Sequence, residues 1–66
     1  MREFFKDESG KAASVTRRVD GGYQLTIIAK YPGRETLHNM QYSSRDAALK
    51  AMGKLGDNWS KRGEWR

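Results

Sequence analysis

The run from Tyr23 to Tyr31 (YQLTIIAKY) constrains the fold more than any other part of the sequence. Apolar side chains occupy every second position, and successive side chains of a β-strand point to opposite faces of its sheet. The run is preceded by Asp20-Gly21-Gly22 and followed by Pro32-Gly33. Gly accepts positive φ without steric cost, and Pro presets φ for the first position of a turn. The sequence therefore predicts a strand between two hairpin turns, with one apolar face and one mainly polar face.

The flanking segments predict the partners of this strand. Residues 12–19 and 35–42 also alternate, and Ser43 and Asp46 have the spacing of a capping box that starts a helix. Residues 2–6, with two phenylalanines at their centre, are a candidate for a fourth strand. Residues 57–66 are predicted to form a last helical turn or an arm. We expect one α+β domain over residues 1–66. It has a three-stranded antiparallel sheet, four-stranded if the N-terminal run pairs, and one C-terminal helix packed on one face.

Periodicity also predicts the core. Val15 and Val19 share one side of the first long strand, and an apolar stripe follows the helix at helical spacing. The residues expected to meet between sheet and helix are Tyr23, Leu25, Ile27, Met40, Tyr42, Met52 and Leu55.

The composition limits the classes of partner and cofactor that this chain can be expected to bind. Thirteen Lys and Arg against eight Asp and Glu leave a net charge of +5, which favours a polyanion but also suits a small domain that must stay soluble. There is no cysteine, and the single histidine, His38, has no neighbour with which to share a metal. No apolar run reaches the roughly 18 residues of a membrane span. We expect a cytoplasmic protein without metal, cofactor or membrane partner.

The polar side of the sheet carries residue types that read DNA. Arg pairs with guanine, Asn and Gln pair with adenine, and Thr or Ile meets a thymine methyl group. Arg17, Arg45 and Lys50 are further candidates for phosphate contacts at the rim. The predicted nucleic-acid-binding residues are Thr16, Arg18, Gln24, Thr26, Lys30, Arg34, Asn39 and Gln41.

The segment from about residue 14 to residue 55 resembles the AP2-like DNA-binding domains at the N-termini of phage-type tyrosine integrases. The shared features are Gly22-Tyr23 at a strand start, Tyr42-Ser43 at a strand end, and a following helix with Ala47 and Ala48. The resemblance implies a three-stranded sheet whose open face lies in the major groove of DNA. Neither the very basic first strand of many members nor a recombinase domain is present in this chain.

A second hypothesis is a protein that binds and inhibits a host protein, because the chain also resembles short accessory proteins encoded by phages and mobile elements. The surface for this role is Ile28, Leu37, Trp59 and Trp65. Polar residues on an exposed strand face are in any case ordinary. No nucleophile–base set and no phosphate-binding glycine loop is apparent, so we expect neither an enzyme nor a small-molecule substrate.

Overall fold

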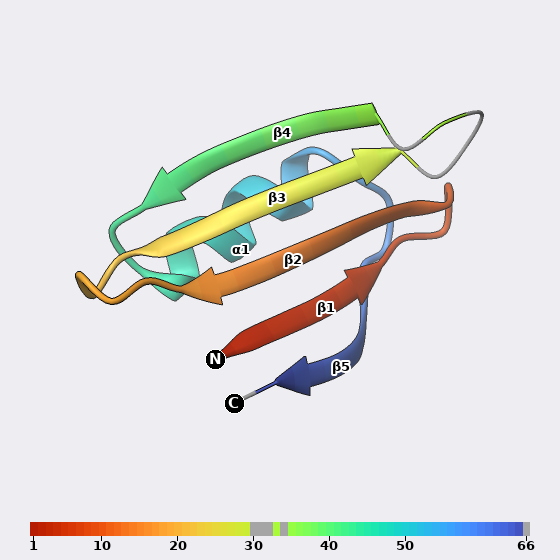
Figure 1. Ribbon diagram of the computed structural model, residues 1–66. Coiled ribbons are helices and arrows are strands. Elements are labelled where there is room, and N and C mark those ends of the chain that lie inside the picture. The colour runs from red at the N-terminus through yellow and green to blue at the C-terminus, as the bar shows by residue number, and fades with distance from the viewer. Residues whose placement is uncertain (30–32, 34, 66) are drawn as a thin grey trace.

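The computed structural model describes residues 1–29, 33 and 35–65. Within these residues the chain forms a five-stranded antiparallel sheet, in the order β4-β3-β2-β1-β5, and one helix (Figure 1). The predicted α+β class is confirmed. The prediction of three or four strands is wrong, because the N-terminal run does pair and a fifth strand, β5, forms as well. The elements are β1 (Arg2–Lys6), β2 (Lys11–Arg17), β3 (Tyr23–Ala29), β4 (Glu35–Tyr42), α1 (Arg45–Lys54) and β5 (Ser60–Trp65).

Strand β5 is neither the helical turn nor the arm expected of the C-terminal tail. It pairs antiparallel with β1 and forms an edge of the sheet, with Glu64 opposite Glu3 and Trp65 opposite Arg2. None of its residues is buried. An edge strand of this kind is held by backbone hydrogen bonds, which impose no apolar period on the side chains.

The turn between β2 and β3 forms as predicted. Gly21 has a φ of +92°, and the Asp20 carboxylate accepts the Gly22 amide at 3.0 Å. The Arg18 amide donates to the Gly22 carbonyl at 2.7 Å and closes the hairpin. The predicted turn at Pro32-Gly33 includes Pro32, which lies outside the described residues.

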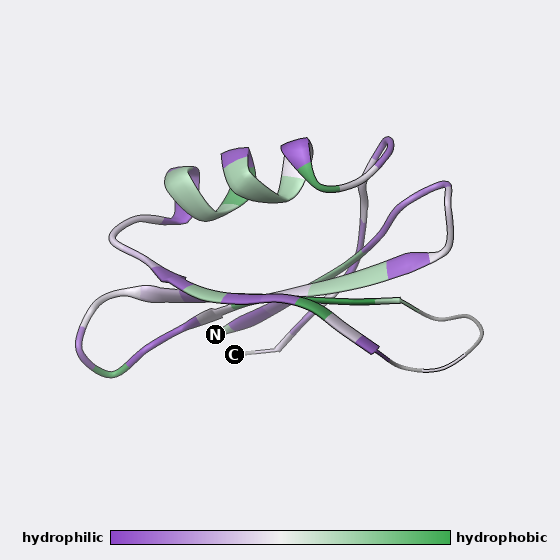
Figure 2. Cartoon of the chain, turned by 90° about the horizontal axis from the view of Figure 1, so that it is seen from above, coloured by the Kyte–Doolittle hydropathy of each residue, from purple (hydrophilic) through white to green (hydrophobic). Residues whose placement is uncertain are grey.

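The core lies between the sheet and α1, and no helix of the described residues covers the opposite face of the sheet (Figure 2). Two predicted core members need correction: Met40 is 55% exposed and Leu55 is 43% exposed. Met40 lies on the edge strand β4, and Leu55 follows the last helical residue as the C-cap. Val19 lies in the turn after β2 and is fully exposed. The buried apolar residues are Phe5, Ala13, Val15, Leu25, Ile27, Ala48 and Met52, with Tyr23 and Tyr42 packed against them.

Helix α1 is capped at both ends. Ser44, rather than the expected Ser43, is the N-cap, and its hydroxyl accepts the Ala47 amide at 3.1 Å. At the other end the Trp59 indole N–H donates to the Met52 carbonyl at 2.6 Å. The Met52 carbonyl also accepts the amide of the C-cap residue Leu55 at 3.0 Å, so the indole adds a second bond to the same oxygen and places Trp59 against the core. Among the described residues no helix is long and apolar enough to cross a membrane.

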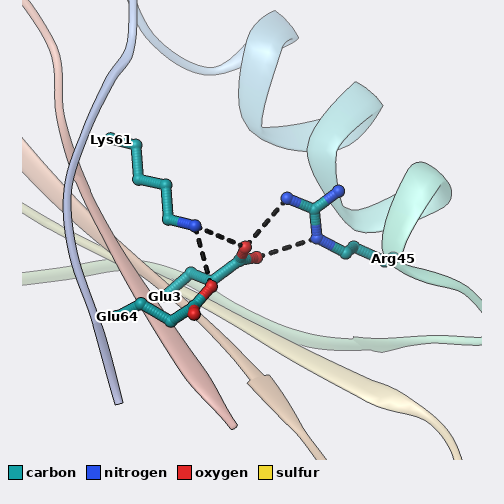
Figure 3. Close-up of polar contacts among 4 residues, drawn as sticks. All are labelled: Glu3, Arg45, Lys61 and Glu64. Atoms are coloured by element: carbon teal, nitrogen blue, oxygen red, sulfur yellow. Dashed lines mark hydrogen bonds and ion pairs between the residues drawn. The ribbon is translucent and has the colours of Figure 1, made fainter. Parts of the chain in front are cut away.

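Two buried carboxylates connect distant parts of the chain. Glu3 on β1 accepts hydrogen bonds from Arg45 at the start of α1 and from Lys61 on β5 (Figure 3). Arg45, with Lys61, holds the pKa of Glu3 below its ordinary value, although burial opposes the shift. Asp7 accepts the amides of Lys11 and Asp57 at 2.7 and 3.0 Å, so it joins the β1–β2 turn to the segment before β5.

Candidate nucleic-acid interface

The open face is the side of the sheet opposite α1. Strand pairing aligns its residues in three rows that cross the sheet from β4 to β5, and we use the name open face for these rows together with Arg18, which follows β2. The first row is Gln41, Gln24, Thr16, Arg2 and Trp65; the second is Asn39, Thr26, Ser14, Phe4 and Gly63; the third is Thr36, Ile28, Ala12, Lys6 and Ser60.

Charge is distributed unequally between the two sides of the sheet. The open face contains Arg2, Lys6 and Arg18, and none of its residues in the described strands is acidic. The strand carboxylates Glu3 and Glu64 lie on the helix side, where they meet Lys61 (Figure 3). Arg18 is paired with Asp20 of the β2–β3 turn at 3.3 Å, whereas the acids of β1 and β5 are directed away from Arg2 and Lys6.

A hydrogen-bond network connects the predicted base-reading residues. The Arg18 guanidinium donates to the Gln24 side-chain carbonyl at 3.1 Å, and the Gln24 amide donates to the Asn39 side-chain carbonyl. Thr26 donates to the same Asn39 oxygen at 3.4 Å. Because this oxygen already accepts two bonds, Asn39 presents mainly its NH₂ group, with two donors, to a ligand.

Arg2 is placed in the same way on β1. Its Nε donates to the Thr16 hydroxyl at 3.1 Å, which uses one of the five N–H donors of a guanidinium. The open face thus combines positive charge with fixed hydrogen-bond donors, the counterpart of phosphate oxygens and of acceptor atoms on base edges.

The end of the open face at β1 and β5 is aromatic. Trp65 is 71% exposed, and its ring meets the half-buried Phe4 ring edge to face, with centroids 6.4 Å apart. Beside Phe4 the small residues of β2 leave a hollow of about 180 Å³. Its lining is Phe4, Ala12, Ala13, Ser14, Thr26 and Ile28.

Most of the predicted DNA-binding residues are brought together. Thr16, Gln24, Thr26, Asn39 and Gln41 occupy neighbouring positions in two rows, with Arg18 at their border. Lys30 and Arg34, also predicted, lie outside the described residues.

The other predicted contacts are distributed differently. Arg45 is paired with buried Glu3, and Lys50 is on α1, so both lie on the side of the sheet away from the open face. Of the residues predicted for protein binding, Ile28 and Trp65 belong to the open face, whereas Trp59 packs under the end of α1. Leu37 lies where the β3–β4 register shifts and has no direct partner on β3.

The sequence did not point to Arg2 and Phe4 as functional residues. The alternation Arg2, Phe4, Lys6 was a usable signal, because it places the three on one face of any strand formed by residues 2–6. Which face that is depends on the pairing of β1 with β2, where Phe4 lies opposite Ser14.

The chain matches no protein-family model, and no curated protein or solved structure is significantly similar to it. The resemblance to integrase N-terminal domains therefore stays a hypothesis.

Proposed function

We propose that this protein is a non-enzymatic DNA-binding module that contacts DNA with the open face of its sheet. The observation that carries the proposal is the separation of charge across the sheet. Arg2 and Lys6 are on the open face, together with Arg18 in its ion pair with Asp20, whereas Glu3 and Glu64 are on the helix side. A face with this charge attracts a polyanion even though the whole chain carries only +5.

The polar network supplies the second part of the interaction. Cations that contact phosphates orient a protein on DNA but carry no sequence information, which comes from contacts with bases. The Asn39 NH₂ group is held in place through Gln24 and Thr26, and Gln41 lies next to it on β4. In the proposed complex, Arg2 and Arg18 contact phosphates while the amides contact bases.

A salt titration tests the proposal. Binding of a labelled mixed-sequence DNA, offered as single strand and as duplex, would be followed by fluorescence anisotropy over a range of salt concentrations. Log affinity should fall linearly with log salt, with a slope of about −0.9 per phosphate contact for duplex and about −0.7 for single strands. Arg2→Gln should make the slope shallower by roughly one such contact.

Lys50→Gln is the matched control, because it removes one positive charge from the exposed side of α1, away from the open face. It should leave the slope unchanged. Absence of binding to either DNA at low salt would refute the proposed function, and equal effects of Arg2→Gln and Lys50→Gln would refute the assignment to the open face.

The apolar hollow favours one alternative, a partner protein such as the host protein that a phage- or mobile-element-encoded inhibitor would bind. An apolar side chain of a partner would fit between Phe4 and Ile28, next to Trp65. Apolar and aromatic side chains dominate the binding energy of protein interfaces. Ile28→Ala and Trp65→Ala would then weaken binding of the partner protein, whereas Arg2→Gln would not. Capture of a partner that persists after nuclease treatment distinguishes this alternative from DNA binding.

A further inference from the structure

We infer that the form of DNA taken by the open face is a single strand, whose bases stack on Trp65 and Phe4 and enter the hollow beside Phe4. This inference rests on the proposed DNA-binding function and names its substrate class. Three properties of the open face carry it: its width, its exposed aromatic rings and its apolar hollow.

The width of the sheet argues against insertion into a groove of duplex DNA. Neighbouring strands are about 4.8 Å apart, so the four spacings between β4 and β5 span about 19 Å. The major groove is about 12 Å wide and admits a helix or a two-stranded ribbon. The full set of open-face residues, from Gln41 on β4 to Trp65 on β5, cannot enter one groove together, whereas an unpaired strand can lie across all five β-strands.

The aromatic rings supply what a single strand requires. Unpaired bases expose their flat faces, and stacking on aromatic side chains is a common way of holding them. Trp65 is 71% exposed, so its side chain contributes little to the stability of the fold and is available to a ligand. Its position opposite Arg2 puts a cation next to the exposed indole, as a base linked to phosphate would need.

The hollow extends this platform toward the polar network. It is lined by Phe4, Ile28 and Thr26 and by the small residues Ala12, Ala13 and Ser14 of β2. An apolar lining gives a phosphate no hydrogen-bond partner. It suits a base, because the flat face of a base is apolar and only its edge carries hydrogen-bonding groups. Thr26 also donates to Asn39, so a base in the hollow would lie beside the amide network.

The experiment compares one strand in two forms. Affinity of the whole chain would be measured for a mixed-sequence oligonucleotide of about 15 nucleotides, near the upper site size of single-strand binders, and for the same strand annealed to its complement. The single strand should bind tighter. Because loss of one stacked base costs roughly 5- to 150-fold in affinity, Trp65→Leu and Phe4→Leu should each weaken single-strand binding by that factor and leave duplex binding unchanged.

Intrinsic fluorescence provides a second measurement. The two tryptophans lie on different sides of the sheet, with Trp65 on the open face and Trp59 bonded to Met52 under α1. Binding of the single strand should quench the emission of the wild type but not of Trp65→Leu, which retains only Trp59. Trp65→Phe keeps a ring and should retain most of the affinity. Met40→Ala, on the helix side, is the apolar control and should bind as the wild type.

The outcomes separate the two proposals. Binding to neither form refutes the proposed DNA-binding function. Duplex binding as tight as single-strand binding, or single-strand affinity that survives both Trp65→Leu and Phe4→Leu in folded protein, overturns this inference while leaving the proposed function standing. An RNA strand of the same sequence is the third arm, and tighter binding of RNA would overturn the assignment to DNA.

Discussion

Glu3 and Arg45 are 42 residues apart in the chain and form a two-point ion pair, with Arg45 Nε and Nη2 at 2.9 and 2.8 Å from the two carboxylate oxygens. Lys61 adds a third bond at 3.1 Å from β5 (Figure 3). One buried carboxylate thus connects the start of α1, the strand β1 and the edge strand β5.

Neutralising this carboxylate should destabilise the fold. In Glu3→Gln, Arg45 and Lys61 lose their acceptor charge and an amide donor faces them in a buried position, so we expect a loss of about 1–3 kcal/mol in the free energy of unfolding. Denaturant titration followed by circular dichroism measures it. Lys50→Gln, an exposed change on α1, should stay within about 0.5 kcal/mol of the wild type. Equal stability of the two variants would show that the ion pair does not hold the elements together.

Asp7 should govern part of the acid sensitivity of the protein. Burial alone would raise its pKa, but hydrogen bonds from Ser9 and from the Asp57 and Lys11 amides outweigh burial and lower the pKa from 3.8 to about 2. A carboxylate with a lowered pKa in the folded state stabilises the protein above the unfolded pKa. This stabilisation is lost as the pH falls from about 3.8 toward 2, because the unfolded chain binds the proton first.

The prediction is checked by measuring the free energy of unfolding between pH 2 and pH 6. Asp7→Asn should be less stable than the wild type at pH 6, and the difference should shrink as the pH falls through this window. A difference between Asp7→Asn and the wild type that is independent of pH would contradict the role of the charge.

Leu25 and Met40 lie opposite each other on β3 and β4, and both were expected in the core. Leu25 is fully buried, whereas Met40 is more than half exposed on the edge strand. Leu25→Ala should therefore cost roughly 2–5 kcal/mol, enough to unfold much of a domain this small. Met40→Ala should cost well under half as much as Leu25→Ala. Thermal melts of the two variants measure the two losses of stability. Similar losses would contradict the exposed position of Met40, because they would mean that α1 covers β4 as well as β3.

Gly56 is required by the packing of Trp59. A Cβ atom on residue 56 would overlap the indole ring of Trp59, whose N–H is bonded to the Met52 carbonyl. Gly56→Ala should displace the ring, break this bond and cost about 1–3 kcal/mol, as overpacked sites do. A shift of tryptophan emission to longer wavelength would report the displaced ring. Gly53→Ala is the control, since a Cβ there meets nothing and a helix favours Ala over Gly. An unchanged spectrum in Gly56→Ala would contradict the close packing.

The sequence by itself determined the central hairpin and the two faces of β3. Asp20-Gly21-Gly22 makes its turn from local hydrogen bonds and a positive φ, and the alternation around Leu25 and Ile27 assigns each side chain to a face without knowledge of distant residues. The grouping of Gln24, Thr26, Asn39 and Gln41 on one face followed from the same alternation, because antiparallel pairing of adjacent strands preserves it.

Only the tertiary structure decided the extent of the sheet and the surroundings of its edges. Residues 60–65 carry no apolar period, since β5 is held by the backbone of β1, and backbone groups are the same in every residue. The burial of Glu3 likewise depends on its partners Arg45 and Lys61. The aromatic end of the open face forms because the neighbouring strands β1 and β5 bring Phe4 and Trp65 together from distant positions in the sequence. Turns and alternation are local properties that a sequence displays, whereas these contacts join residues that become neighbours only when the chain has folded.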